Sequence, residues 1–109
     1  MTLLEFYNIL LEVGIHVGHY EVDIKRSPPY IVYSELNTNY DYASGRPRIE
    51  KIRIEVLHIS KDEFDPSLAN LKNLLHKHKI SFDIATEFHY ERKNIINSFE
   101  LTIQSEILL

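Results

Sequence analysis

Cysteine is absent from this 109-residue chain, and glycine occurs only three times. Without cysteine the chain can form no disulfide and no metal or redox site that needs a thiolate. With so few glycines it contains neither of the glycine-rich phosphate-binding loops, G-x-G-x-x-G and G-x-x-x-x-G-K-[ST]. No apolar run approaches the roughly 18 residues of a membrane helix. The sequence therefore predicts no membrane partner, and it indicates no cofactor.

The residues that are present suit one soluble domain. Apolar residues make up 44% of the chain and the net charge is -4, a balance that is not typical of intrinsic disorder. The length is sufficient for one core, so we expect a single domain over residues 1–109. The first residues contain no basic leader and place Glu5 inside an apolar stretch, which is not typical of a secretion signal. We expect synthesis in the cytoplasm.

Charge is unevenly distributed along the chain. Residues 24–53 hold six basic and three acidic residues, a net of +3, which leaves -7 on the remainder. The basic residues are Lys25, Arg26, Arg46, Arg48, Lys51 and Arg53. Segregation of this kind suits head-to-tail contact between copies or a partner of opposite sign. Ordinary solvated faces are the alternative explanation.

The first segment predicts an amphipathic helix that ends at Gly14. Its apolar residues recur at helical spacing: Leu3, Phe6, Tyr7, Leu10 and Val13. At about 100° per residue, Ile9 falls close to Glu5 and Glu12 on the polar side. We therefore interpret Ile9 as a candidate contact residue, with a single exposed isoleucine as the alternative.

Two predicted strands flank a long polar loop. Residues 30–36 are aromatic and β-branched and follow Pro28-Pro29, which favours a strand. Residues 48–59 alternate between apolar and charged side chains, as a half-buried strand does. The intervening residues 37–47 exceed the usual hairpin loop of about 2–5 residues, so we expect a functional or mobile loop. Its candidate contact residues are Asn39, Tyr40, Asp41, Tyr42, Arg46 and Arg48.

A second helix and a closing hairpin complete the pattern. Asp65 can cap free amides and Pro66 suits the first helical position, so a helix begins here with its leucines facing inward. Residues 81–91 and 95–107 alternate and meet at a turn over residues 92–94. Pairing Tyr90 with Ile95, and hence Phe82 with Ile103, places nearly all their apolar residues on one face.

These elements predict an α+β fold, with an antiparallel sheet of about four strands and two helices packed on one face. The predicted core comprises Leu10, Val32, Ile54, Leu71, Leu75, Ile84, Phe99 and Leu101.

The other face of the closing hairpin carries a row of acids that includes Asp83, Glu87 and Glu100. Such a row fits a general acid/base site, a cation site, an acidic wall along a passage, or a solvated sheet face. No motif supplies the burial or neighbouring charge that catalytic carboxylates need, so we assign no catalytic residue.

The six histidines do not predict a metal site. His76 and His78 lie about 200° apart on the second helix and cannot share an ion as residues i and i+4 can. One observation favours nucleic-acid binding: basic residues lie beside Tyr40 and Tyr42 in the sequence. The overall acidity of the chain opposes it.

In the order of its elements the chain resembles the tail-completion proteins of long-tailed phages and prophages. The resemblance rests on the helix with Leu3-Leu4 and Leu10-Leu11, then Pro29-Tyr30-Ile31-Val32-Tyr33, Asn37-Thr38-Asn39, Ile52-Arg53-Ile54-Glu55-Val56, Asp65 at a helix start, and the hairpin of Phe82 to Tyr90 and Ile95 to Ile103. It covers most of the chain, but residues 15–27 have no alignable pattern.

The resemblance implies a virion structural protein, without an active site, at the junction of tail and head. Members of this family, the tail-to-head joining and tail terminator proteins, form a hexameric ring that caps the tail tube and docks it to the head connector. The expected partners are other copies of the chain, the tail tube protein and the connector protein, with DNA passing through without specific binding. Localisation would be the virion. A ferredoxin-like α+β module that binds a small molecule or peptide is the second hypothesis, and an enzyme ranks third.

Overall fold

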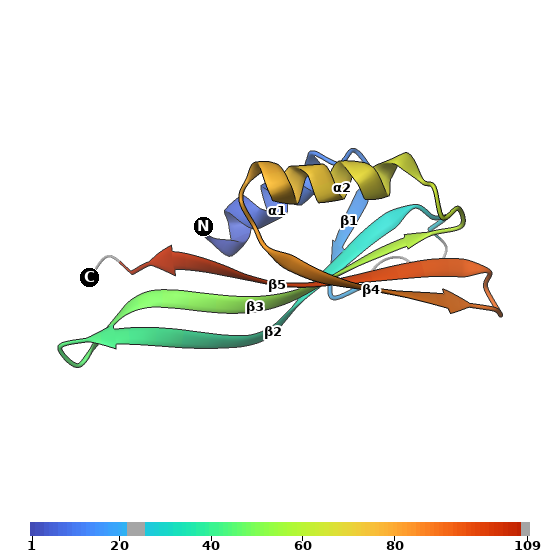
Figure 1. Cartoon of the computed structure of the whole chain (residues 1–109). Coiled ribbons are helices and arrows are strands. Elements are labelled where there is room, and N and C mark those ends of the chain that lie inside the picture. The colour runs from blue at the N-terminus through green and yellow to red at the C-terminus, as the bar shows by residue number, and fades with distance from the viewer. Residues whose placement is uncertain (22–25, 108–109) are drawn as a thin grey trace.

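A sheet of five strands, with two helices on one face, forms the fold (Figure 1). The computed structural model describes residues 1–21 and 26–107, so Lys25 of the basic segment lies outside the described residues. The strands lie in the order β1-β2-β3-β5-β4. The predicted α+β class and the two helices on one face are confirmed.

The sheet differs from the expected four antiparallel strands by one short parallel strand. This strand, β1 (His16–His19), pairs in parallel with the start of β2 (Tyr30–Ala43). Strand β1 lies within residues 15–27, where the sequence shows no recognisable pattern. Four residues are too few to show a clear alternation of apolar and polar side chains. The other strands, β3 (Arg46–Ser60), β4 (Phe82–His89) and β5 (Asn94–Glu106), are antiparallel to their neighbours.

Helix α1 (Leu3–Leu11) forms as predicted, and Phe6, Leu10 and Val13 are buried as expected, but the buried face is shifted toward Ile9. Thr2 and Glu5 make a capping box at its start, and the chain leaves it at Gly14, whose φ of +89° suits glycine. Ile9 is only 7% exposed, so its assignment to an exposed contact face is wrong. The buried stripe runs through Phe6, Ile9 and Val13, while Leu3 and Tyr7 are only partly covered. The helix is therefore rotated relative to the expected orientation.

Helix α2 (Pro66–Lys77) confirms the predicted start. The Asp65 carboxylate accepts a hydrogen bond from the Ser67 amide at 2.9 Å, and Pro66 occupies the first turn. Leu71 and Leu75 are fully buried against the sheet.

The predicted loop over residues 37–47 is instead a continuous two-stranded hairpin. Strands β2 and β3 pair as far as Ala43 and Arg46. Only Ser44 and Gly45 form the turn, with φ of 54° and 74° respectively. Positive φ at both central residues is the geometry of the tight hairpin turn that continues the twist of its strands. The polar, tyrosine-rich residues therefore extend β2 rather than forming a loop.

The closing hairpin has the predicted faces but not the predicted register. Phe82 pairs with Leu101, Ile84 with Phe99, and Phe88 with Ile95. The shift relative to the expected pairing is two residues, which leaves every side chain on its predicted face because the strand repeat is two. Hydrophobic alternation alone cannot distinguish these two registers.

The core lies between the helices and the central strands. Leu10, Ile54, Leu71, Leu75, Phe99 and Leu101 are buried as predicted. Val32 and Ile84 are not. Val32 points away from the helices, since its neighbours Ile31 and Tyr33 are the buried residues of β2. Ile84 is 40% exposed because β4 is an edge strand.

We expect Phe99→Ala to lower the free energy of unfolding by about 3–5 kcal/mol, because it opens a cavity beside α2. Ile84→Ala, on the neighbouring edge strand, should lose less than half as much. Urea unfolding of both variants measures the difference. Equal losses would contradict this core assignment.

Candidate interaction surfaces

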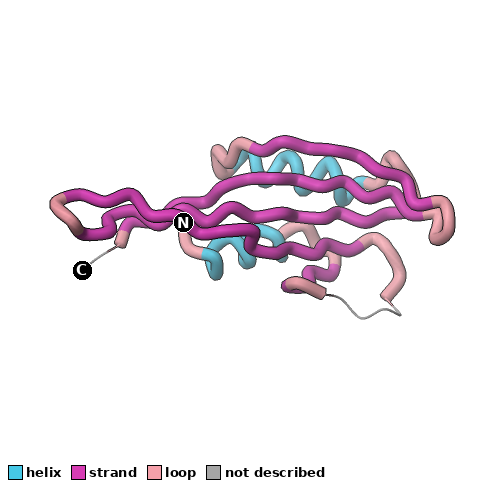
Figure 2. The backbone as a smooth tube through the Cα atoms, turned by 90° about the horizontal axis from the view of Figure 1, so that it is seen from below, coloured by secondary structure: helices cyan, strands magenta, loops and turns pink. Residues whose placement is uncertain are grey.

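The distal part of the β2–β3 hairpin projects beyond the helices. We call residues 37–51 the arm. The molecule measures 52 × 25 × 22 Å, and the arm forms one end of its long axis (Figures 1 and 2). All its residues from 37 to 46 are exposed. Their side chains are polar or tyrosine on both faces, so no helix has to cover them. The two strands of the arm are thus hydrogen-bonded to each other, and most of the side-chain surface of the arm is exposed.

The arm brings together six of the predicted contact residues. Asn39, Tyr40, Asp41 and Tyr42 lie on β2, and Arg46 and Arg48 lie on β3. Two of these six make polar contacts within the arm. The Asp41 carboxylate binds the Lys51 ammonium at 2.9 Å. The pKa of Tyr40 is raised, chiefly because its hydroxyl hydrogen-bonds the Glu50 carboxylate.

The tip of the arm keeps a basic and aromatic surface. Arg46 and Arg48 make no ion pair with any part of the chain that the structure describes. Tyr42 is 67% exposed and pairs with Pro47, the residue between the two arginines on β3. An arginine beside an exposed tyrosine offers a guanidinium for carboxylates and a ring for packing. This surface can therefore bind an acidic partner.

The predicted acidic residues lie on the sheet face opposite the helices, but they are not one uncompensated row. Asp83 and Glu100 are directly paired across β4 and β5, and Glu55 follows on β3. Glu100 accepts two hydrogen bonds from the Arg53 guanidinium, which compensates its charge. Glu87 lies 3.5 Å from the His89 ring nitrogen. The acidic surface thus consists mainly of Asp83, Glu87 and Glu55.

Sequence reasoning missed a buried polar network at the start of α2. His58 is fully buried, and its Nε2 lies 2.7 Å from the Ser67 hydroxyl. That hydroxyl donates to the Asp65 carboxylate at 2.5 Å, so His58 donates from Nε2 in the neutral form. Among the described residues, His58 Nδ1 has no partner. The sequence contained one signal for this network. A histidine, His58, stands among the alternating residues of β3, shortly before Asp65-Pro66-Ser67.

This network is structural and does not have the geometry of nucleophilic catalysis. In a catalytic triad the carboxylate orients the histidine, whereas here Asp65 accepts from Ser67. Ser67 is only 5% exposed, so a substrate cannot reach its hydroxyl. The three residues join the end of β3 to the cap of α2.

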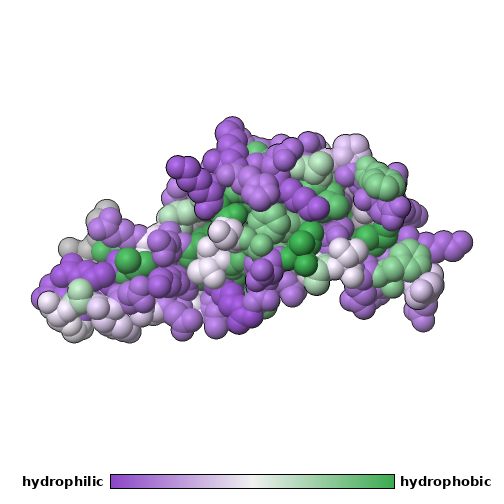
Figure 3. Space-filling view, in the orientation of Figure 1, coloured by the Kyte–Doolittle hydropathy of each residue, from purple (hydrophilic) through white to green (hydrophobic). Residues whose placement is uncertain are grey.

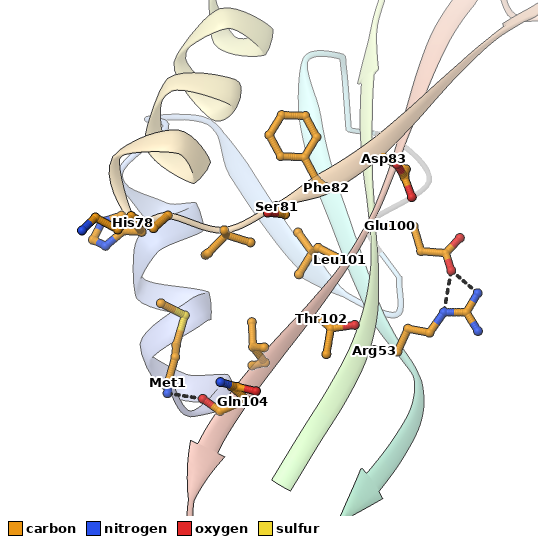
Figure 4. A pocket seen from close by; sticks show the side chains of 13 residues that line it. Met1, Arg53, His78, Ser81, Phe82, Asp83, Glu100, Leu101, Thr102 and Gln104 are labelled. Carbon is orange, nitrogen blue, oxygen red and sulfur yellow. Dashed lines mark hydrogen bonds and ion pairs between the residues drawn. The ribbon is translucent and has the colours of Figure 1, made fainter. Parts of the chain in front are cut away.

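A groove lies where β4 diverges from β5, between the start of α1 and the end of α2 (Figure 4). Its volume is about 570 Å³. Beyond Leu101, no strand among residues 1–21 and 26–107 pairs with β5 on this side, so the groove exposes its edge. The terminal amine of Met1 already donates to the Gln104 carbonyl at 2.5 Å. The Arg53–Glu100 pair lies at the opposite wall.

No three metal-ligating side chains gather closely enough to hold an ion within residues 1–21 and 26–107. In the same ranges, no helix has the length and apolar character needed to cross a bilayer. Comparisons with protein-family models and with curated proteins give no match for this chain. The fold and its surfaces define an α+β protein with a projecting arm.

The buried His58 predicts a loss of stability in mild acid. Burial lowers the pKa of this imidazole from 6.5, although Asp65 partly opposes the shift. As the pH falls below about 6.5, the unfolded chain takes up a proton that the folded chain resists, so stability declines until the folded pKa is passed. His58→Leu should flatten this part of the profile, whatever its effect on stability at neutral pH.

Urea unfolding between pH 8 and pH 5 measures this effect. His16→Gln, at an exposed histidine of β1, is the matched control and should keep the wild-type profile. Parallel profiles for wild type and His58→Leu would show that His58 is not the group responsible.

Proposed function

We propose that the chain is a tail-completion subunit of a phage or prophage virion. In this proposal several copies, six by the family resemblance, form a ring at the head-proximal end of the tail tube and join the tail to the head connector. The arm is the observation that carries the proposal. A paired hairpin that covers no core, yet presents Tyr42, Arg46 and Arg48, suits contact with another subunit.

Ring formation requires two different surfaces on each copy, one that reaches out and one that receives. The arm and the β4–β5 turn lie at opposite ends of the molecule (Figure 1). The arm offers the arginines, and Asp83 on β4 offers a carboxylate. Opposite charges at separate sites favour a head-to-tail arrangement over a symmetric pair of arms.

The acidic surface also suits a passage for DNA. A duplex binds proteins tightly through Lys and Arg contacts with its phosphates, so carboxylates along a passage keep it from adhering. Glu87 is the strongest candidate because it is exposed and contacts only His89 among the charged groups described. Glu100 is a weaker candidate than the sequence predicts, because Arg53 compensates it.

A peptide-binding module is the second candidate function. The groove beside the open edge of β5 favours it, because an extended peptide can add to an exposed strand. The ferredoxin-like part of this hypothesis does not fit, since that fold has the order β-α-β-β-α-β and this chain has α-β-β-β-α-β-β. A gene position among tail and head-completion genes would favour the virion role over this one.

Removing the contact groups of the arm should abolish joining and spare the fold. In Tyr42→Ser/Arg48→Ser, both changed side chains are exposed, so urea unfolding should remain within about 0.5 kcal/mol of wild type. Isolated tails completed with this variant should fail to join DNA-filled heads, as measured by infectious particles formed in vitro. Phe64→Ser/Lys77→Ser, which removes one exposed aromatic and one exposed cation outside the arm, is the matched control. If the arm variant joined tails to heads at wild-type yield, the proposed role of the arm would be wrong.

Reversing one acid tests the proposed passage. Glu87→Lys should leave the ring intact and slow DNA ejection, because the new cations contact phosphates. Light scattering of triggered particles measures ejection, and raising the salt concentration should restore the rate. Normal ejection at low salt from particles that contain the variant would exclude Glu87 from the passage.

A further inference from the structure

Strand β4 leaves one whole edge of the sheet unpaired. It is the last strand in the sheet order, and Figure 2 shows no element beside its outer edge. Seven of its eight residues are exposed. Large apolar side chains lie among them or directly after them: Ile84 is 40%, Phe88 44% and Tyr90 84% exposed. Apolar surface is visible along this side of the molecule, below the helices (Figure 3).

The open edges of β1 and of β2 along the arm are less suited to pairing with another strand than the edge of β4. The opposite edge strand, β1, has only four residues. The free edge of β2 along the arm is polar, and its pairing is interrupted between Glu35 and Asn37 and between Asp41 and Tyr42. Strand β4 contains no Lys or Pro, and its register with β5 is uninterrupted. A long, regular, apolar edge is a template for another strand.

One antiparallel pairing of β4 with β4 of a second copy is complementary at most positions, the exception being Ala85 opposite Glu87. It has its two-fold axis at Thr86. On the helix side it places Ile84 opposite Phe88 twice. On the other face it places Asp83 opposite His89, a carboxylate facing an imidazole that donates a hydrogen bond or carries positive charge.

Neighbouring registers are unfavourable for reasons of charge. An axis at Ala85 places Asp83 opposite Glu87 twice, and an axis at Glu87 places that carboxylate opposite itself. An axis between residues 85 and 86 sets Asp83 against Phe88 and Ile84 against Glu87. Like charges directly opposite one another are destabilising, as is an acid against an apolar side chain.

We propose that the free protein is a symmetric dimer in which two β4 strands pair antiparallel about Thr86, forming one continuous sheet with all helices on the same side. Tyr90 of each copy then lies opposite Phe82 of the other. These aromatic residues meet at the groove between α2 and β4, which is lined by Lys72, His76, Lys79, Ile80, Ser81, Phe82 and Ile84. The dimer covers Ile84, Phe88 and Tyr90, which the single copy leaves exposed.

The observations that support this dimer do not depend on the proposed virion role, although Asp83 would have to leave the dimer contact before it meets an arm. A two-fold pair uses the same surface on both copies, whereas a ring uses two different surfaces. The dimer would be the state in solution, and its formation needs neither tails nor heads. A failure of the dimer would leave the arm experiments unaffected.

Single-cysteine crosslinking tests the register, and the absence of native cysteine makes it specific. Directly opposite residues have Cα atoms about 4.5–5.5 Å apart, within the range of a disulfide. Thr86→Cys should therefore yield mostly covalent dimer after oxidation with diamide. In Ala85→Cys the two cysteines would be diagonal neighbours about 7–8 Å apart, so this matched control should remain mostly uncrosslinked. Efficient crosslinking of Ala85→Cys alone, or of neither variant, would overturn the proposed register.

Sedimentation of the unmodified protein tests the dimer itself. Phe88→Lys should raise the dimer Kd at least about tenfold, whereas Tyr42→Lys, at an exposed aromatic of the arm, should not change it. Circular dichroism confirms that both variants fold. Asp83→Lys and His89→Glu should each weaken the dimer, and the double exchange should restore it. A protein that is monomeric at about 100 μM, well above the Kd of most specific interfaces, would exclude the proposal.

Discussion

The burial of one face of β3 is the constraint on which the rest of the structure depends. This strand is paired on both sides, with β2 and with β5. Its residues Ile52, Ile54 and Val56 are buried in the core. Both helices pack over the same stretch of the sheet. Each of its buried side chains removes apolar area from water at about 25 cal/mol per Å², which no exposed contact in this small domain matches. The positions of α1 and α2 follow from covering this face.

Where the helices end, the composition of the strands changes with them. Beyond Ile52 no helix covers the arm, and most of its residues are polar, charged or tyrosine. The hairpin persists there because its backbone hydrogen bonds and cross-strand pairs, such as Asp41 with Lys51, continue without a core. The same chain thus provides a packed half that holds the fold and a solvated half available for contact. This division is the physical basis for assigning the arm to assembly.

The two exposed ends of the sheet are chemically different. The arm carries arginine and tyrosine and has irregular, polar edges, which suits a partner met only in assembly. Strand β4 carries apolar residues on a regular edge, which suits a partner present in solution. The two surfaces therefore lie at opposite ends of the molecule and differ in chemistry.

Much of the fold could be predicted because it depends on local chemistry. The helix starts at Thr2 and Asp65 follow from capping, and the buried alternation of β3 follows from its sequence alone. The faces of β4 and β5 were also determined locally, since even a shift of two residues preserves them. The turn at Ser44-Gly45 was available in the sequence as a turn dipeptide, although the polar residues around it favoured a loop.

Only the tertiary structure decided the rest. The register of the closing hairpin, the pairing of the short β1 and the extension of β2 to Ala43 all depend on partners distant in sequence. So does exposure: Ile9 is buried although it is flanked by acids on its helix, and Ile84 is exposed although it alternates correctly. The reason is that periodicity states which side chains share a face. The neighbours of that face determine whether it is covered, and for β4 no neighbour within the described chain covers its edge.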